Sequence, residues 1–121
     1  MTSQFKHQLC PKYPEILGSL LAPSDIGDGW FALVDELCAL LSEDVKKTGL
    51  PCKATQVKEK LGELRCRCAL PPQSDYRRAA IEAARLKSMV TCDVCGLAGQ
   101  LVAESGWLRT RCQLHHNERI L

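Results

Sequence analysis

Two short cysteine-bearing turns near the C-terminus constrain the fold of this chain more than any other feature. Cys92 and Cys95 form a C-x-x-C pair, Cys112 and His115 form a C-x-x-H pair, and sixteen residues separate the two pairs. Turns of this kind direct two ligand atoms toward one point, so two of them supply the four ligands of a tetrahedral zinc ion. The spacing therefore predicts a zinc ribbon, a β-hairpin held at one end by a metal ion.

The residues between the two pairs fit the strands of such a hairpin. LAGQLVAE and GWLRTRC are predicted to pair as antiparallel strands across Ser105 and Gly106, and Gly96 lies where the first turn needs positive φ. His116 is an alternative fourth ligand, but His115 is preferred because C-x-x-H repeats the spacing of the first pair. A Cys3His shell has no open position, so we expect one structural Zn²⁺ that stabilises the fold without taking part in catalysis.

The composition of the chain is that of a single globular domain. It has 121 residues, of which 45% are hydrophobic and 25% are charged, as in an average soluble protein. Its apolar runs are too short for a membrane span, and its N-terminus lacks the order of a secretory signal. We therefore expect a cytoplasmic protein whose eight cysteines are thiols or metal ligands, because a reducing compartment disfavours disulfides.

Residue periodicity before the ribbon predicts an α+β body over 1–90, followed by the zinc ribbon over 91–121. After an irregular, proline-bearing start, a helix is expected at about 29–44, capped by Asp28. A β-hairpin is expected at about 53–69 and a second helix at about 74–88. The predicted fold class is thus α+β, a single compact domain in the order helix, β-hairpin, helix and zinc-ribbon β-hairpin.

The buried faces of these elements follow from the same periodicity. The first helix should bury Trp30, Val34, Leu37, Cys38 and Leu41. The second helix should begin at an N-cap and turn its stripe of apolar residues inward. Ser74 is the expected N-cap, and the stripe is Tyr76, Ala80, Ala83 and either Leu86 or Lys87.

The second strand of the hairpin carries two cysteines on one face. Because side chains alternate along a strand, Leu64, Cys66 and Cys68 share a face, and Arg65 and Arg67 share the other. An inward face makes both cysteines part of the core. A redox pair or a second metal pair formed by this C-x-C sequence is the alternative.

Several catalytic classes do not fit the sequence. The HHN tripeptide suits an HNH nuclease, but too few residues follow the last knuckle for a ββα-metal unit. The chain also contains no glycine-rich phosphate loop and no G-x-S-x-G elbow. We therefore expect that the protein is not an enzyme and that it acts by binding a partner.

Charge is distributed unevenly along the chain. Up to Val45 there are two basic and seven acidic residues, and from Lys46 onward there are fourteen basic and seven acidic residues. Internal complementarity between the two halves is one explanation, and two binding surfaces are the other. The acidic surface would be a helix face formed by Asp35, Glu36, Glu43 and Asp44. The nucleic-acid or partner contacts would be Lys58, Lys60, Arg65, Arg67, Trp107, Arg109 and Arg111.

The two arginines before the second knuckle have another explanation. Three thiolates, a neutral imidazole and Zn²⁺ carry a net charge of −1, which Arg109 and Arg111 could offset because they share a strand face close to Cys112. The alternative is that they form an exposed contact stripe with Trp107. The sequence leaves both explanations open.

Three segments resemble a widespread family of small, mostly uncharacterised bacterial and phage-borne proteins. The similar segments are GDGWFALVDELC at 27–38, QVKEKLGELR at 56–65, and CDVCGLAG with GWLRTRCQLH at 92–115. The resemblance supports the same four metal ligands. It also marks as signature positions Trp30, Lys58, Glu59, Lys60, Gly62 and Arg65.

The chain differs from this family at three positions. The resemblance nevertheless implies a biological context. The family usually has an aromatic residue where Leu61 stands and apolar or aromatic residues where Cys66 and Cys68 stand. The resemblance implies a phage or mobile-element protein that binds a host protein or nucleoprotein complex, for example as an inhibitor of a defence system. The alternative is a zinc-ribbon protein that binds nucleic acid through its basic C-terminal half.

Overall fold

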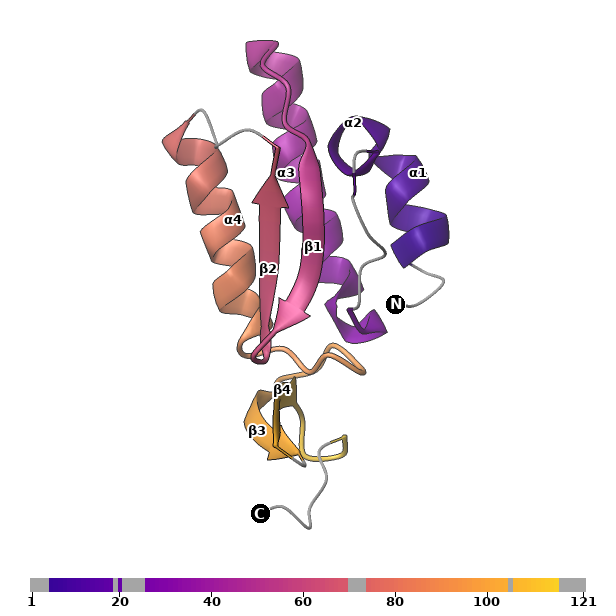
Figure 1. Cartoon of the computed structure of the whole chain (residues 1–121), viewed down its shortest axis with the longest axis vertical. Coiled ribbons are helices and arrows are strands. Elements are labelled where there is room, and N and C mark those ends of the chain that lie inside the picture. The colour runs from indigo at the N-terminus through magenta and orange to yellow at the C-terminus, as the bar shows by residue number, and fades with distance from the viewer. Residues whose placement is uncertain (1–4, 19, 21–25, 70–73, 105, 116–121) are drawn as a thin grey trace.

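The structure is an α+β fold with two small antiparallel sheets, which confirms the predicted fold class (Figure 1). This computed structural model describes residues 5–18, 20, 26–69, 74–104 and 106–115. The first sheet pairs β1 (Ala54–Lys60) with β2 (Glu63–Cys68), and it lies against the helices α3 (Phe31–Thr48) and α4 (Asp75–Ser88). The second sheet pairs β3 (Gln100–Glu104) with β4 (Trp107–Arg111) at one end of the molecule. No helix among the described residues is long and apolar enough to cross a membrane.

The N-terminal segment is helical from Phe5 to Lys12 and from Pro14 to Leu17, so the irregular start that we expected is wrong for these residues. A single π turn at Phe5–Leu9 leads into α1 (Cys10–Lys12) and α2 (Pro14–Leu17). Each proline stands at the start of a helix, where its missing N–H breaks no intrahelical hydrogen bond. The buried side chains of this segment close one side of the core, and they are Leu9, Tyr13, Ile16 and Leu17.

Helix α3 is the central element of the core. It is entered through a 3-10 turn at Asp28–Trp30, so the Asp28 side chain makes no cap hydrogen bond, contrary to expectation. The helix continues to Thr48, where the left-handed Gly49 donates its N–H to the Val45 carbonyl at 2.8 Å. Its buried side chains form the predicted stripe, and Trp30 and Val34 are fully buried.

Helix α4 begins as predicted but turns a different face inward. The Ser74 hydroxyl accepts the N–H of Arg77 at 3.2 Å, which confirms the N-cap. Tyr76, Ala83 and Leu86, expected to face inward, are exposed, whereas Arg77 is 1% exposed. The buried residues of the helix are Arg77, Ala80, Ala84 and Ser88.

The buried arginine determines this orientation of α4. Its guanidinium donates to the Asp44 carboxylate at 2.7 Å and to the carbonyls of Leu50 at 2.6 Å and Pro51 at 3.0 Å. A charge buried with a paired carboxylate and satisfied donors is tolerated, but breaking such a network leaves an uncompensated charge. Hydrophobic periodicity assigns arginine to the surface, which is why it predicted the wrong face.

The β1–β2 hairpin presents one face to the helices and the other outward. Val57 and Leu64 are buried against the core, while Lys58 pairs with Arg65 on the opposite face. Leu61 and Gly62 form the turn at φ 56° and 82°. Two successive residues with positive φ are characteristic of a type I′ turn, for which glycine and asparagine are preferred.

Leu61 therefore stores backbone strain, and replacing it should stabilise the protein. Leu61 is 59% exposed, so Leu61→Asn removes little packing and relieves a conformation that costs about 1 kcal/mol for a leucine. We expect the free energy of unfolding in urea to rise by about 0.5–1 kcal/mol. The matched control is Leu50→Asn, which replaces another exposed leucine outside the turn and should change stability by less than about 0.5 kcal/mol. A destabilised Leu61→Asn variant would contradict the strain.

Candidate metal centre

The four predicted ligands meet at the end of the ribbon where both knuckles lie, before β3 and after β4. The ligand atoms of Cys92, Cys95, Cys112 and His115 all lie within 4.8 Å of one another, and they form the one such cluster found among the described residues. The His115 Nδ1 lies 3.2 Å from the Cys112 Sγ and 3.7 Å from the Cys92 Sγ. The Cys95 and Cys112 sulfurs are 3.7 Å apart. His116, the alternative ligand, lies outside the described residues.

These separations fit a tetrahedral ion. Sulfur about 2.3 Å and nitrogen about 2.0 Å from a tetrahedral zinc ion leave ligand atoms about 3.5–3.8 Å apart. Three of the ligand–ligand separations, 3.2, 3.7 and 3.7 Å, are close to those values, and all of them lie within 4.8 Å. Three thiols with one imidazole are also a donor set that favours zinc over hard cations such as Mg²⁺. The cluster is thus a candidate metal site, and zinc is the ion whose coordination it matches.

The backbone around the first knuckle prepares Cys92 for metal binding. Its side chain is fully buried, and burial disfavours a thiolate. The backbone amides of Cys112, Cys95 and Val94 outweigh that effect and lower the pKa of the Cys92 thiol to about 6. A thiolate is the metal-binding form of cysteine, so this environment favours coordination at neutral pH.

Each knuckle is closed by its own backbone hydrogen bond. Gly96 donates to the Cys92 carbonyl at 3.0 Å, and His115 donates to the Cys112 carbonyl at 3.1 Å. Gly96 has φ 83°, as the sequence predicted for this turn. The first strand begins only at Gln100, later than expected, because Leu97 accepts the Cys92 N–H at 2.7 Å within the knuckle loop.

The first knuckle docks on the turn that precedes α3. Gly29 donates its N–H to the Asp93 carbonyl at 3.0 Å, and the Trp30 indole donates to the Thr91 carbonyl at 2.8 Å. The two backbones are so close that a Cβ on Gly29 would lie 2.1 Å from the Cys92 oxygen, and one on Gly27 would lie 2.0 Å from the Asp93 oxygen. The GDGW turn therefore supports the first knuckle of the metal site through close backbone contacts.

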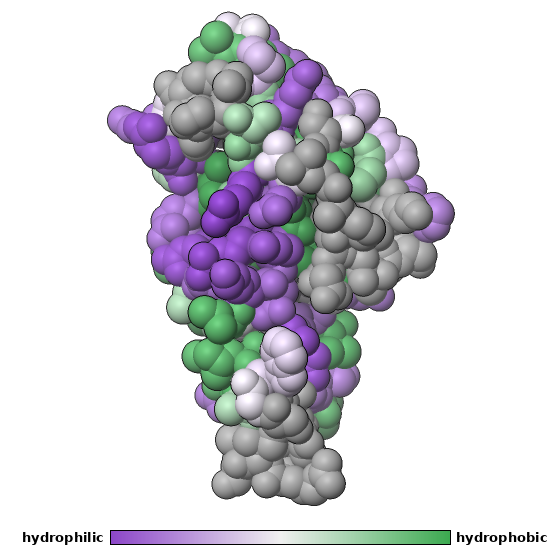
Figure 2. Space-filling view, in the orientation of Figure 1, coloured by the Kyte–Doolittle hydropathy of each residue, from purple (hydrophilic) through white to green (hydrophobic). Residues whose placement is uncertain are grey.

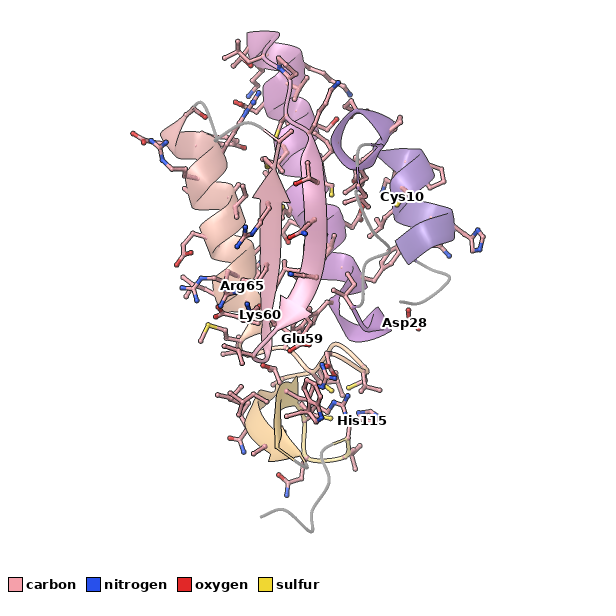
Figure 3. The ribbon with its side chains drawn as sticks, in the orientation of Figure 1. Cys10, Asp28, Glu59, Lys60, Arg65 and His115 are labelled. Carbon is pink, nitrogen blue, oxygen red and sulfur yellow. The ribbon has the colours of Figure 1, made fainter. Side chains whose placement is uncertain are left out.

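The second strand of the ribbon docks on the tip of the β1–β2 hairpin. Thr110, which is 1% exposed, donates its hydroxyl to the Gly62 carbonyl at 2.5 Å. Glu59 accepts from Arg109 at 2.5 Å with one oxygen and from the Gly62 N–H at 2.7 Å with the other. Glu59 lies at the ribbon end of the hairpin in Figure 3. Glu59 and Gly62 thus have a structural role, because they join the hairpin tip to the ribbon.

The predicted contact residues lie in three different environments. Arg109 and Arg111 are held in ion pairs within the molecule, Arg109 with Glu59 and Arg111 with Asp93 at 2.9 Å. Lys58, Lys60, Arg65 and Arg67 lie together on the outer face of the β1–β2 hairpin. Trp107 is 69% exposed at the far end of the ribbon.

The four carboxylates of the predicted acidic face all form ion pairs within the molecule. The Asp35 carboxylate accepts from Lys12 at 3.0 Å and from the Tyr13 hydroxyl at 2.7 Å, and Asp44 accepts from the buried Arg77. The exposed pairs are Glu36 with Lys87 at 2.8 Å and Glu43 with Lys47 at 3.7 Å. Each of the four carboxylates thus has a cationic partner, and three of these partners, Lys47, Arg77 and Lys87, come from the basic half of the chain, whereas Lys12 belongs to the acidic half.

Sequence reasoning missed two polar residues that position the metal site. Asp93 is 6% exposed and pairs with Arg111, and its carbonyl receives the Gly29 N–H. Thr110 joins the ribbon to the hairpin tip. No local sequence rule marked Asp93, because its partner Arg111 is 18 residues away. No sequence signal marked Thr110 either, because its hydrogen-bond partner is a backbone carbonyl 48 residues away.

We expect purified protein to contain one zinc ion per chain and to lose it when a ligand is removed. Cys95→Ser and His115→Ala should abolish stoichiometric zinc and unfold the ribbon, because structural zinc contributes on the order of 10 kcal/mol in isolated fingers. His116→Ala is the control and should keep its zinc. Elemental analysis and chelator competition measure both quantities. Protein purified without chelators and found free of zinc would refute the site.

We also expect that Gly29→Ala weakens zinc binding from outside the coordination shell. The new Cβ would lie 2.1 Å from the Cys92 oxygen, so the knuckle must shift, at an expected cost of more than about 2 kcal/mol in urea unfolding. Gly49→Ala is the comparison, because Gly49 has positive φ but open space around it. It should cost only about 1 kcal/mol and leave zinc affinity unchanged. Equal effects of the two substitutions on zinc affinity would contradict the docking.

The fold and the candidate metal centre are assigned from the structure of this chain alone. No family model, no curated protein and no solved structure matches the chain. The candidate metal centre is therefore assigned from the geometry of the four ligands and of their seat on the GDGW turn.

Proposed function

We propose that this chain is a non-enzymatic zinc-ribbon protein that binds nucleic acid through the outer face of the β1–β2 hairpin. The observation that carries the proposal is the clustering of four cations on that face. By strand register, Lys58 lies opposite Arg65, and Arg67 lies opposite Gln56. Figure 2 shows a continuous hydrophilic surface over this part of the molecule, above the ribbon.

Most of the charge on this face is available to a partner. Lys58, Lys60 and Arg67 have no ion pair within the part of the chain that the structure describes. Arg65 pairs with Glu63 at 2.7 Å, but the same carboxylate also accepts from Arg85 at 2.8 Å. Arg85 is also paired with Glu82 at 2.6 Å, so Glu63 offsets one charge of this face, and Lys58, Lys60 and Arg67 give it a net positive charge that favours phosphate.

The strand geometry also suits a polyanion. Residues two apart on one strand face are about 6.8 Å apart, which is twice the rise of about 3.4 Å per phosphate in one DNA strand. Lys58 and Lys60 on β1, with Arg65 and Arg67 on β2, form two parallel rows of cations at this spacing. Phosphate contacts of this kind supply affinity without sequence specificity.

The exposed apolar side chains of the ribbon favour a nucleoprotein complex as the second candidate. Leu101 is 54% exposed and Trp107 is 69% exposed, and large exposed apolar residues of this kind are frequent anchors at protein interfaces. A host nucleoprotein complex would contact the cationic face of the hairpin with its nucleic acid and the exposed apolar side chains of the ribbon with its protein. The phage or mobile-element context, and inhibition of a defence system, rest on the sequence resemblance alone.

Nucleic-acid binding should depend steeply on salt and on the hairpin lysines. For the double variant Lys58→Gln/Lys60→Gln, we expect the slope of log affinity against log salt to fall by about 2, because each lysine releases about one counterion. Fluorescence anisotropy of labelled duplex and single-stranded oligonucleotides across a salt series measures this slope.

The matched control removes the same charge elsewhere. Lys46→Gln/Lys47→Gln alters two exposed lysines on the last turn of α3, and its salt slope should equal that of the unmodified protein. Absence of binding at low salt, or equal slopes for the two double variants, would overturn the proposal.

A further inference from the structure

One of the two tryptophans lies on the surface of the ribbon and contributes to neither the core nor the metal centre. Trp107 is 69% exposed at the start of β4, whereas Trp30 is fully buried and hydrogen-bonded. The Trp107 indole has no hydrogen bond within the part of the chain that the structure describes. An exposed indole keeps a large apolar ring in water, which is unfavourable until a partner covers it.

Strand β4 crosses the turn of the cationic hairpin, and this places Trp107 close to the proposed binding face (Figure 1). The backbone carbon and nitrogen of Arg109 lie 3.4 and 3.5 Å from the position that a Cβ on Gly62 would take. Trp107 precedes Arg109 by two residues, which is about 7 Å along a strand. Gly62 follows Lys60 by two residues, at most about 7 Å of chain. Trp107 and Lys60 are therefore no more than about 20 Å apart.

One strand of nucleic acid can extend from the hairpin lysines to this ring. With one phosphate about every 3.4 Å, six nucleotides or so cover about 20 Å. The basic side chains that follow on β4, Arg109 and Arg111, are already paired with Glu59 and Asp93. The ribbon end of this path therefore presents an aromatic ring and no unpaired cation of β4, which suits a base better than a phosphate.

We propose that Trp107 stacks on an unpaired base, so that the nucleic acid bound by this chain is single-stranded. This inference rests on the proposed binding through the outer face of the β1–β2 hairpin. The bases of an intact duplex are stacked on one another, and exposing the flat face of one base requires unstacking it. Every base has such a face, so one stacking residue adds affinity without selecting a sequence.

The charge of the neighbouring surface favours a base over a protein side chain as the partner of the indole. Exposed tryptophans are also common anchors at protein interfaces. Here, however, the cations without an ion pair among the described residues, Lys58, Lys60 and Arg67, lie on the hairpin whose turn contacts β4. A single strand supplies phosphates for these cations and a base for Trp107 in one molecule.

Intrinsic fluorescence tests the stacking directly, because the chain has two tryptophans and Trp30 is buried. Single-stranded oligothymidylate of about ten nucleotides is long enough to cover both surfaces. Its addition to the full chain, purified without chelators, should quench the emission of Trp107. The same strand annealed to oligoadenylate should bind more weakly and without quenching, since phosphate contacts alone remain.

Two substitutions separate stacking from a general apolar contact. Trp107→Leu keeps an apolar side chain but removes the ring, so affinity for the single strand should fall about tenfold and affinity for the duplex should not change. Trp107→Phe keeps a ring and should lose less than about threefold. Neither removes a cation, so the slope of log affinity against log salt should match that of the unmodified protein. Fluorescence anisotropy measures the affinities, and urea unfolding checks that the exposed position tolerates both changes.

The results distinguish failure of this inference from failure of the proposed function. If neither nucleic acid binds at low salt, both are wrong. If the hairpin lysines set the salt slope but Trp107→Leu binds the single strand as tightly as the unmodified protein, the stacking alone is wrong. Binding without quenching, or an equal loss of single-strand and duplex affinity in Trp107→Leu, would also overturn the stacking.

Discussion

The structure depends on the close contact between the first metal knuckle and the turn that begins α3. Two hydrogen bonds define it, from the Gly29 N–H to the Asp93 carbonyl and from the Trp30 indole to the Thr91 carbonyl. A side chain on Gly29 would collide with the knuckle backbone, so glycine is required there for steric reasons. Because Trp30 is also fully buried in the core, the metal site and the core share one residue, and disturbing either should affect the other.

A second contact connects the metal centre to the proposed binding face. Glu59 accepts from Arg109 of the ribbon and from the Gly62 N–H of the hairpin turn. The side chains of β1 alternate, so Glu59 faces the ribbon and core side while its neighbours Lys58 and Lys60 face outward. A metal ion bound at the four ligands would act on the binding face indirectly, by holding the ribbon that contacts the tip of the cationic hairpin. Figure 3 shows Lys60 and Arg65 on this hairpin and His115 in the ribbon below it.

Local sequence rules gave correct predictions where a residue type strongly prefers one structural position, such as a metal ligand or a helix cap. The ligand spacing from Cys92 to His115 predicted a cluster that the structure brings together, because short turns leave little freedom to a pair of ligands. Ser74 was predicted as a cap for the same reason. The predicted face of α4 was wrong because Arg77 is anchored by Asp44 and by two loop carbonyls. No periodicity rule anticipates a buried arginine, since its partners come from α3 and the chain after it.

The sequence by itself determined the α+β class, the four residues that meet at the candidate metal site and the order of the elements from α3 onward, because caps, alternation and knuckle spacing act over a few residues. Only the tertiary structure decided which charges remain available. Arg109, Arg111, Asp35 and Asp44 are neutralised by partners distant in sequence, whereas Lys58 and Lys60 have no such partner among the described residues. These outcomes depend on how helices and hairpins pack, and packing is set by the sum of many long-range contacts that no short segment encodes.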